Sequence, residues 1–365
     1  MRVHAVVAGW LLGTGPSGAN RRLVSILRAA AEQLGPGEEI TLLHAAHTPP
    51  PDLPAAIRCL PVAIPPGPAW RRALAERRIL PGLLESLGAT VYEQAWLPLA
   101  RKLPVPACLT LHDLRDLTRF QRYPRWLYLL LLRRSLERAR YVVVPSRFTW
   151  EELKAVAGDR LPPTTIVQNG VETARFAAAQ PQGQEPCYLH VGRLEPRKNL
   201  LMLLSAYAQV LDDAADPQLV PPLVFAGADG GAGKQLAERA AFLEVAGKVH
   251  FLGQVDEDRL LSLYAAAVAV LVPSLYEGFG LCALEGLAAG KLVVASDRGA
   301  LPEIVEDSGV VVGAGDTAGW ARAMRNVDRL AHDPFLSAAR TRRVKELSWE
   351  RAAASVLELW WELSR

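Results

Sequence analysis

A chain of 365 residues is long enough for two domains, and 50% apolar with 22% charged residues is a globular composition. Its four cysteines show neither a C-x-x-C pair nor metal-ligand spacing, which favours free thiols in a reducing cytosol over disulfides or a structural metal site. The net charge of +3 is unevenly divided, because residues 1–175 hold 23 Lys and Arg against 14 Asp and Glu. This basic half predicts an anionic partner, such as a lipid surface or a diphosphate, and the lack of a nucleic-acid motif disfavours nucleic acid.

The sequence shows no targeting or membrane-spanning segment. Residues 2–8 form too short an apolar run for a signal peptide, and no other run reaches the roughly 20 residues of a transmembrane helix. We therefore expect a cytoplasmic protein. The basic half leaves open a peripheral position on the inner face of the membrane.

The first predicted strand, Val3 to Ala8, leads into G-T-G-P-S-G at residues 13–18 and a helix over residues 20–34. This loop literally matches the G-x-G-x-x-G pattern of dinucleotide-binding domains. That pattern also needs an acidic residue at the end of the second strand, but the predicted strand over residues 40–45 ends in the segment His44 to His47 and has no Asp or Glu there. Binding of a nicotinamide dinucleotide is therefore disfavoured.

A later strand, predicted over residues 107–112, closes with L-T-L-H-D. His112 lies at its carboxyl end, where ligand clefts form in α/β sheets, although a lone histidine is more often structural. Residues 115–140 then combine eight arginines with W-L-Y-L-L-L-L. One interpretation is a helix that lies on an anionic membrane surface. The other, which is favoured, is a core helix whose basic side faces solvent.

An Ala-, Gln- and Gly-rich segment, residues 177–185, is predicted to link two domains. The next strand is followed by G-R-L-E-P-R-K-N and a helix. Arg193 and Lys198 place two cations at a glycine turn before that helix. This arrangement favours a diphosphate-binding site over the alternative interpretation, a solvated loop without a ligand.

Further on, G-A-D-G-G-A-G-K-Q resembles a P-loop. Ala228 and Gln235 replace its first glycine and its magnesium-binding Ser or Thr, so we reject an NTPase.

The most informative stretch is residues 273–303, which follows an apolar strand and begins P-S-L-Y-E-G-F-G-L. Its apolar spacing predicts a helix over residues 281–289. Free N–H groups at a helix start bind anions and hydroxyls, and the amides of Phe279, Gly280 and Leu281 occupy that place. We therefore expect a ligand at this loop–helix junction.

Two carboxylates flank the junction, Glu277 before the helix and Glu285 within it. Carboxylates in a cleft accept hydrogen bonds from hydroxyls, so two of them suit two sugar rings; the simpler alternative is a capped helix with one solvated glutamate. The arrangement E-G-F-G-L-x-x-x-E after P-S resembles the donor-site signature of the retaining family 4 glycosyltransferases. The layout of H-D-L, S-x-F-T and N-G-V most resembles the mannosyltransferase-like branch of that family.

The resemblance extends over nearly the whole chain and implies the α/β GT-B fold, in which two doubly wound parallel-sheet, Rossmann-like domains face a central cleft. We expect an acceptor-side domain at residues 1–178 and a nucleotide-sugar donor domain at residues 179–347. A terminal helix, residues 348–365, is expected to cross back to the first domain.

Matched residue by residue, the resemblance implies that Arg193 and Lys198 neutralise the donor diphosphate as it leaves. It places Glu277 and His112 near the transferred sugar, and Glu285 on the ribose. The other expected donor contacts are the amides of Phe279, Gly280 and Leu281, the base contacts Gly253 and Gln254, and the glycine-loop residues Gly15, Ser17 and Gly18.

The implied reaction moves a hexosyl group, mannosyl in the branch that fits best, from a nucleoside diphosphate sugar to an acceptor hydroxyl with retention. A GDP-sugar is slightly favoured over a UDP-sugar, and the acceptor would be a glycan or a lipid-linked precursor in polysaccharide or glycoconjugate synthesis. No cofactor is expected, and the lack of D-x-D at the sugar site predicts metal independence. The alternatives are a catalytically silent sugar-nucleotide-binding protein and a GT-B phosphorylase, whose pyridoxal lysine site no segment resembles.

Overall fold

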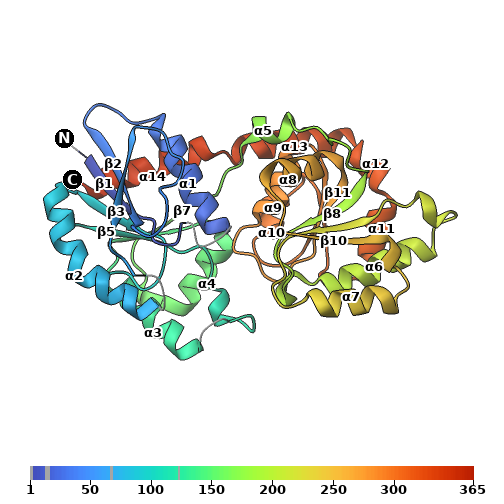
Figure 1. Cartoon of the computed structure of the whole chain (residues 1–365), viewed down its shortest axis with the longest axis horizontal. Helices are drawn as coiled ribbons and strands as arrows, with labels where there is room; N and C mark the ends of the chain where they lie inside the picture. Colours follow the sequence, from blue (N-terminus) through green and yellow to red (C-terminus); the bar gives the residue numbers. More distant parts are fainter. Residues whose placement is uncertain (1–2, 13–16, 66–68, 122–123) are drawn as a thin grey trace. The chain divides into compact units, whose positions relative to one another are not determined.

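The structure is a computed structural model that describes residues 3–12, 17–65, 69–121 and 124–365. It divides into two units (Figure 1). The first unit comprises Met1–Gly170 and Trp349–Arg365, and the second comprises Val171–Ser348. Within the described residues each unit holds one sheet whose strand pairs are all parallel, so the predicted pair of Rossmann-like sheets is confirmed.

The first unit is built on a seven-stranded sheet. Its strands are β1 (Val3–Ala8), β2 (Glu38–Ala45), β3 (Ile57–Val62), β4 (Val91–Gln94), β5 (Ala107–Thr110), β6 (Tyr141–Val144) and β7 (Thr164–Ile166), in the order β3-β2-β1-β4-β5-β6-β7. Its main helices are α1 (Gly18–Ala31), α2 (Ala69–Leu87), α3 (Arg125–Leu136), α4 (Arg147–Ala157) and α14 (Trp349–Leu363), with 3-10 turns η1 (Arg115–Leu117) and η2 (Gly158–Arg160). Figure 1 shows α1 and α14 on one face of the sheet and α2, α3 and α4 on the other. Every residue of β1 is buried, as expected for a central strand covered on both faces.

The second unit is built on a six-stranded sheet. Its strands are β8 (Cys187–Val191), β9 (Leu223–Ala226), β10 (Val249–Gly253), β11 (Ala267–Val272), β12 (Leu292–Ser296) and β13 (Val310–Val312), in the order β10-β9-β8-β11-β12-β13. Its α-helices are α5 (Thr173–Ala177), α6 (Leu200–Asp212), α7 (Gly233–Phe242), α8 (Glu257–Ala266), α9 (Leu281–Ala288), α10 (Leu301–Val305), α11 (Thr317–Arg325), α12 (Val327–Ala331) and α13 (Pro334–Glu346), and its 3-10 turns are η3 (Pro196–Lys198), η4 (Pro217–Leu219) and η5 (Ala246–Lys248). One apolar core packs α6, α7 and α11 on the sheet, and another packs α8, α9 and α10.

The division between the units lies after Gly170, eight residues before the predicted boundary at 178/179. The reason is α5, a short helix that packs in the core of the second unit. Its Phe176 meets Tyr264 of α8 edge-to-face, with ring centroids 5.3 Å apart. The segment 177–185, predicted as the linker, therefore lies inside the second unit and not between the two.

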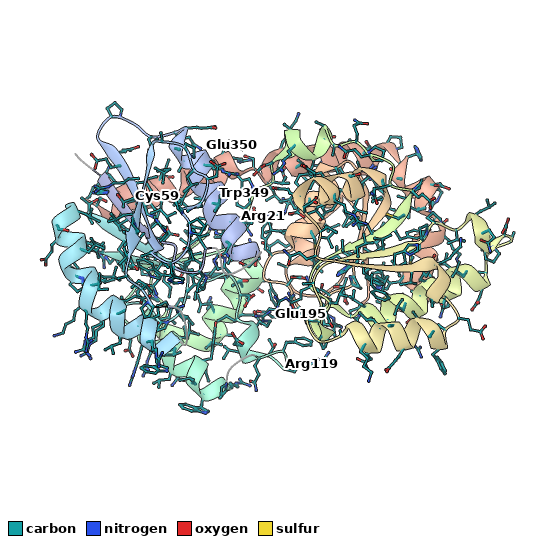
Figure 2. All side chains as sticks on the ribbon, in the orientation of Figure 1. Arg21, Cys59, Arg119, Glu195, Trp349 and Glu350 are labelled. Atoms are coloured by element: carbon teal, nitrogen blue, oxygen red, sulfur yellow. The ribbon has the colours of Figure 1, made fainter. Side chains whose placement is uncertain are left out.

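The terminal helix α14 belongs to the first unit, although the whole second unit precedes it in sequence. It packs against α1 and β1. Trp360 Nε1 donates a buried hydrogen bond to Glu93 Oε2 over 2.7 Å, and Gln33 of the first unit donates to the backbone oxygen of Glu350 over 3.0 Å. Trp349 and Glu350 mark the start of this helix in Figure 2.

The arginine-rich stretch, residues 115–140, forms the short turn η1 and the twelve-residue α3 instead of one long helix. Leu132 and Leu136 of α3 are buried, whereas Trp126 is 68% and Leu130 is 38% exposed. The helix therefore contributes to the core and also presents apolar side chains to solvent. Across the described ranges, no helix is both long and apolar enough to cross a bilayer.

Candidate active site

The two signature loops leave the second sheet at the same place. β8 and β11 are paired neighbours, and the chain extends the sheet from them in opposite directions, through β9 and β10 on one side and β12 and β13 on the other. In open parallel sheets, ligands bind at the carboxyl ends of the strands where the strand order reverses. G-R-L-E-P-R-K-N follows β8 and P-S-L-Y-E-G-F-G-L follows β11, so both loops lie at this position.

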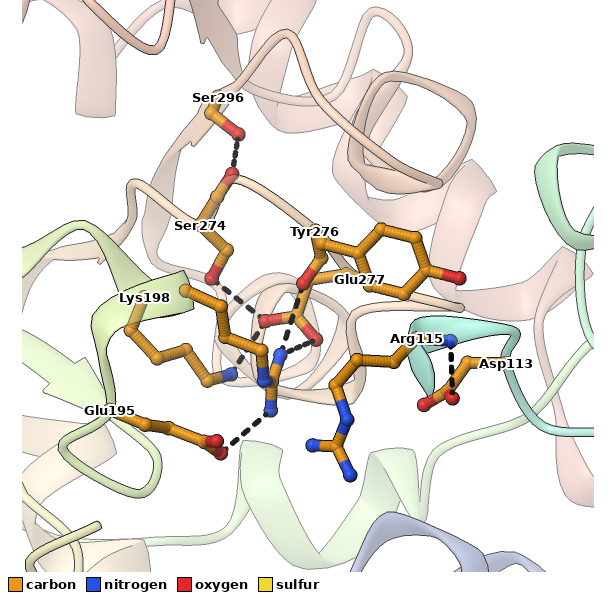
Figure 3. Close-up of polar contacts among 9 residues, drawn as sticks. Asp113, Arg115, Glu195, Lys198, Ser274, Tyr276, Glu277 and Ser296 are labelled. Carbon is orange, nitrogen blue, oxygen red and sulfur yellow. Dashed lines mark hydrogen bonds and ion pairs between the residues drawn. The ribbon is translucent and has the colours of Figure 1, made fainter. Parts of the chain in front are cut away.

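A group of five side chains joins the two loops, and we call it the Glu277 cluster (Figure 3). Its members are Glu277, Lys198, Arg197, Glu195 and Ser274. Lys198 Nζ and Ser274 Oγ donate to Glu277 Oε1 over 2.5 and 2.7 Å. Arg197 Nη1 donates to Glu277 Oε2, and its Nη2 donates to Glu195 Oε1, each over 3.1 Å. Lys198 and Glu277, which were predicted from separate motifs, are thus in direct contact.

Burial and charge act on Glu277 in opposite directions. Burial raises the pKa of its carboxyl group, whereas the nearby cations Lys198 and Arg197 lower it, and the pKa of Glu277 ends well below its usual range. Burial lowers the pKa of Arg197, but Glu277 and Glu195 outweigh it and the net pKa is raised. Glu277 is therefore an anion at neutral pH, held by two cations.

The backbone around Glu277 leaves no room for another side chain. Gly299 has a φ of +63°, and a Cβ at this position would lie 2.6 Å from the oxygen and 2.7 Å from the nitrogen of Glu277. The neighbouring Ala300 N donates to Glu277 O over 3.0 Å. Glycine at position 299 therefore lets the loop after β12 support the Glu277 backbone directly.

The start of α9 presents the three predicted amides. Gly280 has a φ of +107°, which favours glycine, and turns the chain into the helix. Within the described part of the chain, no group accepts a hydrogen bond from the amides of Phe279, Gly280 or Leu281. These N–H groups therefore remain available to a ligand at a helix N-terminus.

Glu285, the predicted ribose contact, is only 4% exposed and is held by a tyrosine. Tyr264 Oη, from α8, donates to Glu285 Oε2 over 2.6 Å. This bond fixes the direction of the carboxylate and takes up part of its accepting capacity. Tyr264 is therefore a positioning residue for Glu285.

The remaining candidates of the second unit are Arg193, Gly253 and Gln254. Arg193 is exposed, and its stem lies against Gly230, where a Cβ would come within 2.6 Å of the arginine Cγ. Among the described residues it forms no ion pair, so its diphosphate role stays a prediction. Gly253 ends β10 and accepts a hydrogen bond from Gly227 N over 2.8 Å, and Gln254 is exposed beside it.

The glycine-loop candidates are described only in part. Gly15 lies outside the described residues. Ser17 is the N-cap of α1 and accepts a hydrogen bond from Asn20 N over 3.1 Å, and Gly18 is the first residue of that helix. The Ser17 hydroxyl is used as an acceptor by the cap, but it can still donate to a ligand.

His112 follows β5 in the first unit and lines a small cavity with Arg22 and Glu93. Burial, aided by the positive charge of Arg22, lowers the pKa of His112 to about 3, so its imidazole is neutral. Its Nε2 has no hydrogen-bond partner among the described residues. Arg22 Nη1 donates to Val167 O over 2.9 Å and to the side chain of Asn169, which ties α1 to the N-G-V turn.

The sequence did not predict Arg197, Glu195, Ser274, Tyr264 or Arg22 as site residues. Arg197, Glu195 and Ser274 lie inside the two quoted motifs, so their place was known but not their contacts. Tyr264 and Arg22 lie outside both motifs, and only the packing of α8 and α1 brings them to the candidate residues. No spacing rule in the sequence indicates either.

In the part of the chain that the structure describes, no three His, Cys, Asp or Glu side chains converge on a potential metal site.

Family models match both units: one described as Glycosyltransferase Family 4 matches residues 16–175, and one described as Glycosyl transferases group 1 matches residues 172–343. A glycogen synthase of Mycobacterium tuberculosis is 30% identical over 319 residues, which are 80% of this chain and 75% of that protein. The chain belongs to glycosyltransferase family 4.

Other proteins resemble this family 4 glycosyltransferase over shorter or longer spans. A D-inositol 3-phosphate glycosyltransferase of Geodermatophilus obscurus is 39% identical over 211 residues, which cover 53% of this chain and 46% of that protein. The solved structure of a sucrose-phosphate synthase from Thermosynechococcus elongatus covers 99% of both chains with a TM-score of 0.82, at 21% identity. The structural likeness supports the GT-B fold and nothing beyond it.

The contact between Tyr264 and Glu285 predicts a binding defect in this glycosyltransferase. Tyr264→Phe removes one hydrogen bond to a buried carboxylate, which typically costs about 1.5 kcal/mol, and we expect the Kd of the nucleoside diphosphate to rise about tenfold. Calorimetric titration measures it. Tyr207→Phe is the matched control, because that hydroxyl donates to Pro221 O instead. An unchanged Kd in Tyr264→Phe would contradict the positioning role.

Proposed function

We propose that this enzyme transfers a hexosyl group from a nucleoside diphosphate sugar to an acceptor hydroxyl with retention of configuration. The observation that carries the proposal is the Glu277 cluster beside the three available amides, at the switch point of the second sheet. A diphosphate needs cations and N–H donors, and a sugar needs a hydrogen-bond acceptor. Lys198, the start of α9 and Glu277 supply these three in one place.

In the proposed reaction, the bond between the anomeric carbon and the diphosphate oxygen breaks. The electron pair stays with the diphosphate, where Lys198 and the amides stabilise the growing negative charge. A new bond forms between the anomeric carbon and the acceptor oxygen on the same face, and the departing diphosphate takes the acceptor's proton. Cationic side chains perform this stabilisation, so the proposed reaction is independent of a metal ion. Arg193 and His112 are proposed as further contacts of the diphosphate and the sugar.

Lys198→Ala tests the leaving-group role. Removing one preorganised donor costs about 3 kcal/mol of barrier, and we expect turnover to fall at least about tenfold. Lys234→Ala is the control, because Lys234 is an exposed lysine of the same unit and its side chain is 91% accessible. Both variants are compared with the wild type by transfer rate and melting temperature. Unchanged turnover in a folded Lys198→Ala protein would remove the diphosphate role from Lys198.

The identity of the donor can be tested by ligand-induced stabilisation. We propose a GDP-hexose, mannosyl by preference, over a UDP-hexose, on the layout of H-D-L, S-x-F-T and N-G-V. Thermal melting with GDP, UDP, ADP and dTDP and their sugars should then show the largest increase with the GDP series, since a ligand that binds only the folded state stabilises it. A larger increase with UDP would overturn the preference for GDP. Binding without transfer or hydrolysis would favour a silent sugar-nucleotide-binding protein.

We further propose that one face of the first unit contacts an anionic membrane, which fits a lipid-linked acceptor. α2 and α3 lie on the same face of the sheet (Figure 1) and carry four exposed apolar side chains, Trp70, Leu74, Trp126 and Leu130. The same two helices carry six exposed arginines: Arg71, Arg77, Arg78, Arg125, Arg133 and Arg134. Burial and the like charges of Arg101 and Arg134 lower the pKa of the nearby Arg138, so positive charge is concentrated here. Apolar groups within basic ones are what an anionic bilayer surface binds.

Flotation with vesicles tests this face. We expect the protein to float with vesicles that contain anionic phosphatidylglycerol and not with pure phosphatidylcholine, and Trp70→Ala with Trp126→Ala to lower the floating fraction at least about threefold. Phe242→Ala is the control, because Phe242 is 77% exposed in the second unit. Equal flotation with both lipids would count against a preference for an anionic membrane, and no flotation with either would count against membrane contact.

A further inference from the structure

Arg197 and Lys198 are consecutive residues of η3, yet they hold opposite oxygens of one carboxylate. Lys198 contacts Glu277 Oε1, and Arg197 contacts Oε2. Arg197 is also fixed by two further contacts: its Nη1 donates to Tyr276 O over 3.0 Å and its Nη2 to Glu195 Oε1 over 3.1 Å. Its guanidinium is therefore held on three acceptors, whereas Glu277 is the one partner found for the Lys198 ammonium among the described residues.

The hydrogen bonds at Glu277 leave little accepting capacity. A carboxylate has about four lone-pair positions. Two on Oε1 are used by Lys198 and Ser274, and one on Oε2 is used by Arg197. One position therefore remains, on Oε2, which is enough for one hydroxyl and too little for a vicinal pair of hydroxyls.

We propose that Arg197 is a positioning residue that keeps Glu277 charged, oriented and open to a single sugar hydroxyl while Lys198 engages the donor diphosphate. This inference rests on the proposed transfer reaction and adds to it a residue and a division of labour. The diphosphate is an anion that competes with Glu277 for Lys198. If Lys198 were the sole counter-ion, its shift toward the diphosphate would leave a buried carboxylate unpaired, which is strongly unfavourable. Because Arg197 stays on Oε2, Glu277 keeps a cation throughout.

Arginine suits this role better than a second lysine would. Its planar fork presents several donors in fixed directions, so one side chain can hold Glu277, Glu195 and the backbone oxygen of Tyr276 together. It also stays charged at every accessible pH. Lys198, with a flexible stem and three donors on one nitrogen, can instead turn from Glu277 toward a ligand.

The proposal predicts a pH effect at Glu277. The titratable or charged groups that face Glu277 are Lys198 and Arg197 from η3, His190 from β8 and Cys282 from α9. Burial, followed by the charge of Lys198, lowers the pKa of His190 to about 4, and burial raises the pKa of Cys282 to about 12, so both are neutral near pH 7. Loss of Arg197 removes one of the two cations that lower the pKa of Glu277. The pKa of Glu277 then rises, and activity that needs its anion is lost at a higher pH than in the wild type.

The experiment compares Arg197→Met with the wild-type full chain over pH 4.5 to 9, measuring kcat and the KM of donor and acceptor. We expect kcat at pH 7 to fall at least tenfold and the acceptor KM to stay within twofold. The variant should also lose kcat toward the acid end of this range, where the wild type, whose Glu277 has a pKa well below the range, should keep it. The kcat of Arg197→Lys should be at least threefold higher than that of Arg197→Met. Arg259→Met is the control, because Arg259 is an exposed arginine on α8 of the same unit, and it should match the wild type.

The outcomes separate this inference from the proposed function. A wild-type protein that neither binds a nucleoside diphosphate nor transfers sugar would overturn the function itself. A wild-type protein that transfers sugar, together with an Arg197→Met variant of unchanged kcat and pH profile, would overturn the role of Arg197 alone. If Arg197→Met melts below the assay temperature, Arg197→Gln takes its place, since it keeps hydrogen-bond donors without charge. A wild-type pH profile from Arg197→Gln would likewise overturn the proposal.

Discussion

The charge of one largely buried carboxylate, Glu277, whose side chain is 12% exposed, has to be compensated inside the protein, and the rest of the candidate site follows from this requirement. A buried anion without partners is among the costliest features a fold can contain. Its partners Lys198 and Arg197 lie about 80 positions earlier in the chain, in the loop after a different strand. The ion pairs therefore also fix the two loops to each other, at the carboxyl ends of β8 and β11.

The sheet makes this pairing feasible. Because the strand order reverses between β8 and β11, the chain continues from these neighbouring strands toward opposite sides of the sheet, and open parallel sheets bind ligands at such a position. The glycines at 280 and 299 let the backbone approach this position closely, one by turning the chain into α9 and the other by lying against the Glu277 backbone. Charge, topology and backbone conformation thus specify the same location.

Much of this could be predicted from the sequence. β1 and the start of α9 were predicted at their observed positions, because apolar periodicity and glycine punctuation are local properties. The linker prediction was wrong because α5 is only five residues long, which is too short for a helical period to show in the sequence. Its place depends on Phe176, which packs against Tyr264 of α8. The candidate site was predicted as a set of residue types, whereas the contacts within it were not. Which cation meets which carboxylate oxygen depends on side-chain directions across two loops, and no spacing along one chain encodes them.

The return of α14 to the first unit has a consequence for the order in which the protein can fold. The second unit is continuous in sequence, so all of its segments have been synthesised once the chain reaches Ser348. The first unit still lacks Trp349–Arg365 at that point, and the buried carboxylate of Glu93 still lacks its bond from Trp360. The unit whose synthesis starts first is thus completed last. Its final helix, α14, can pack onto it only after the whole second unit has been synthesised.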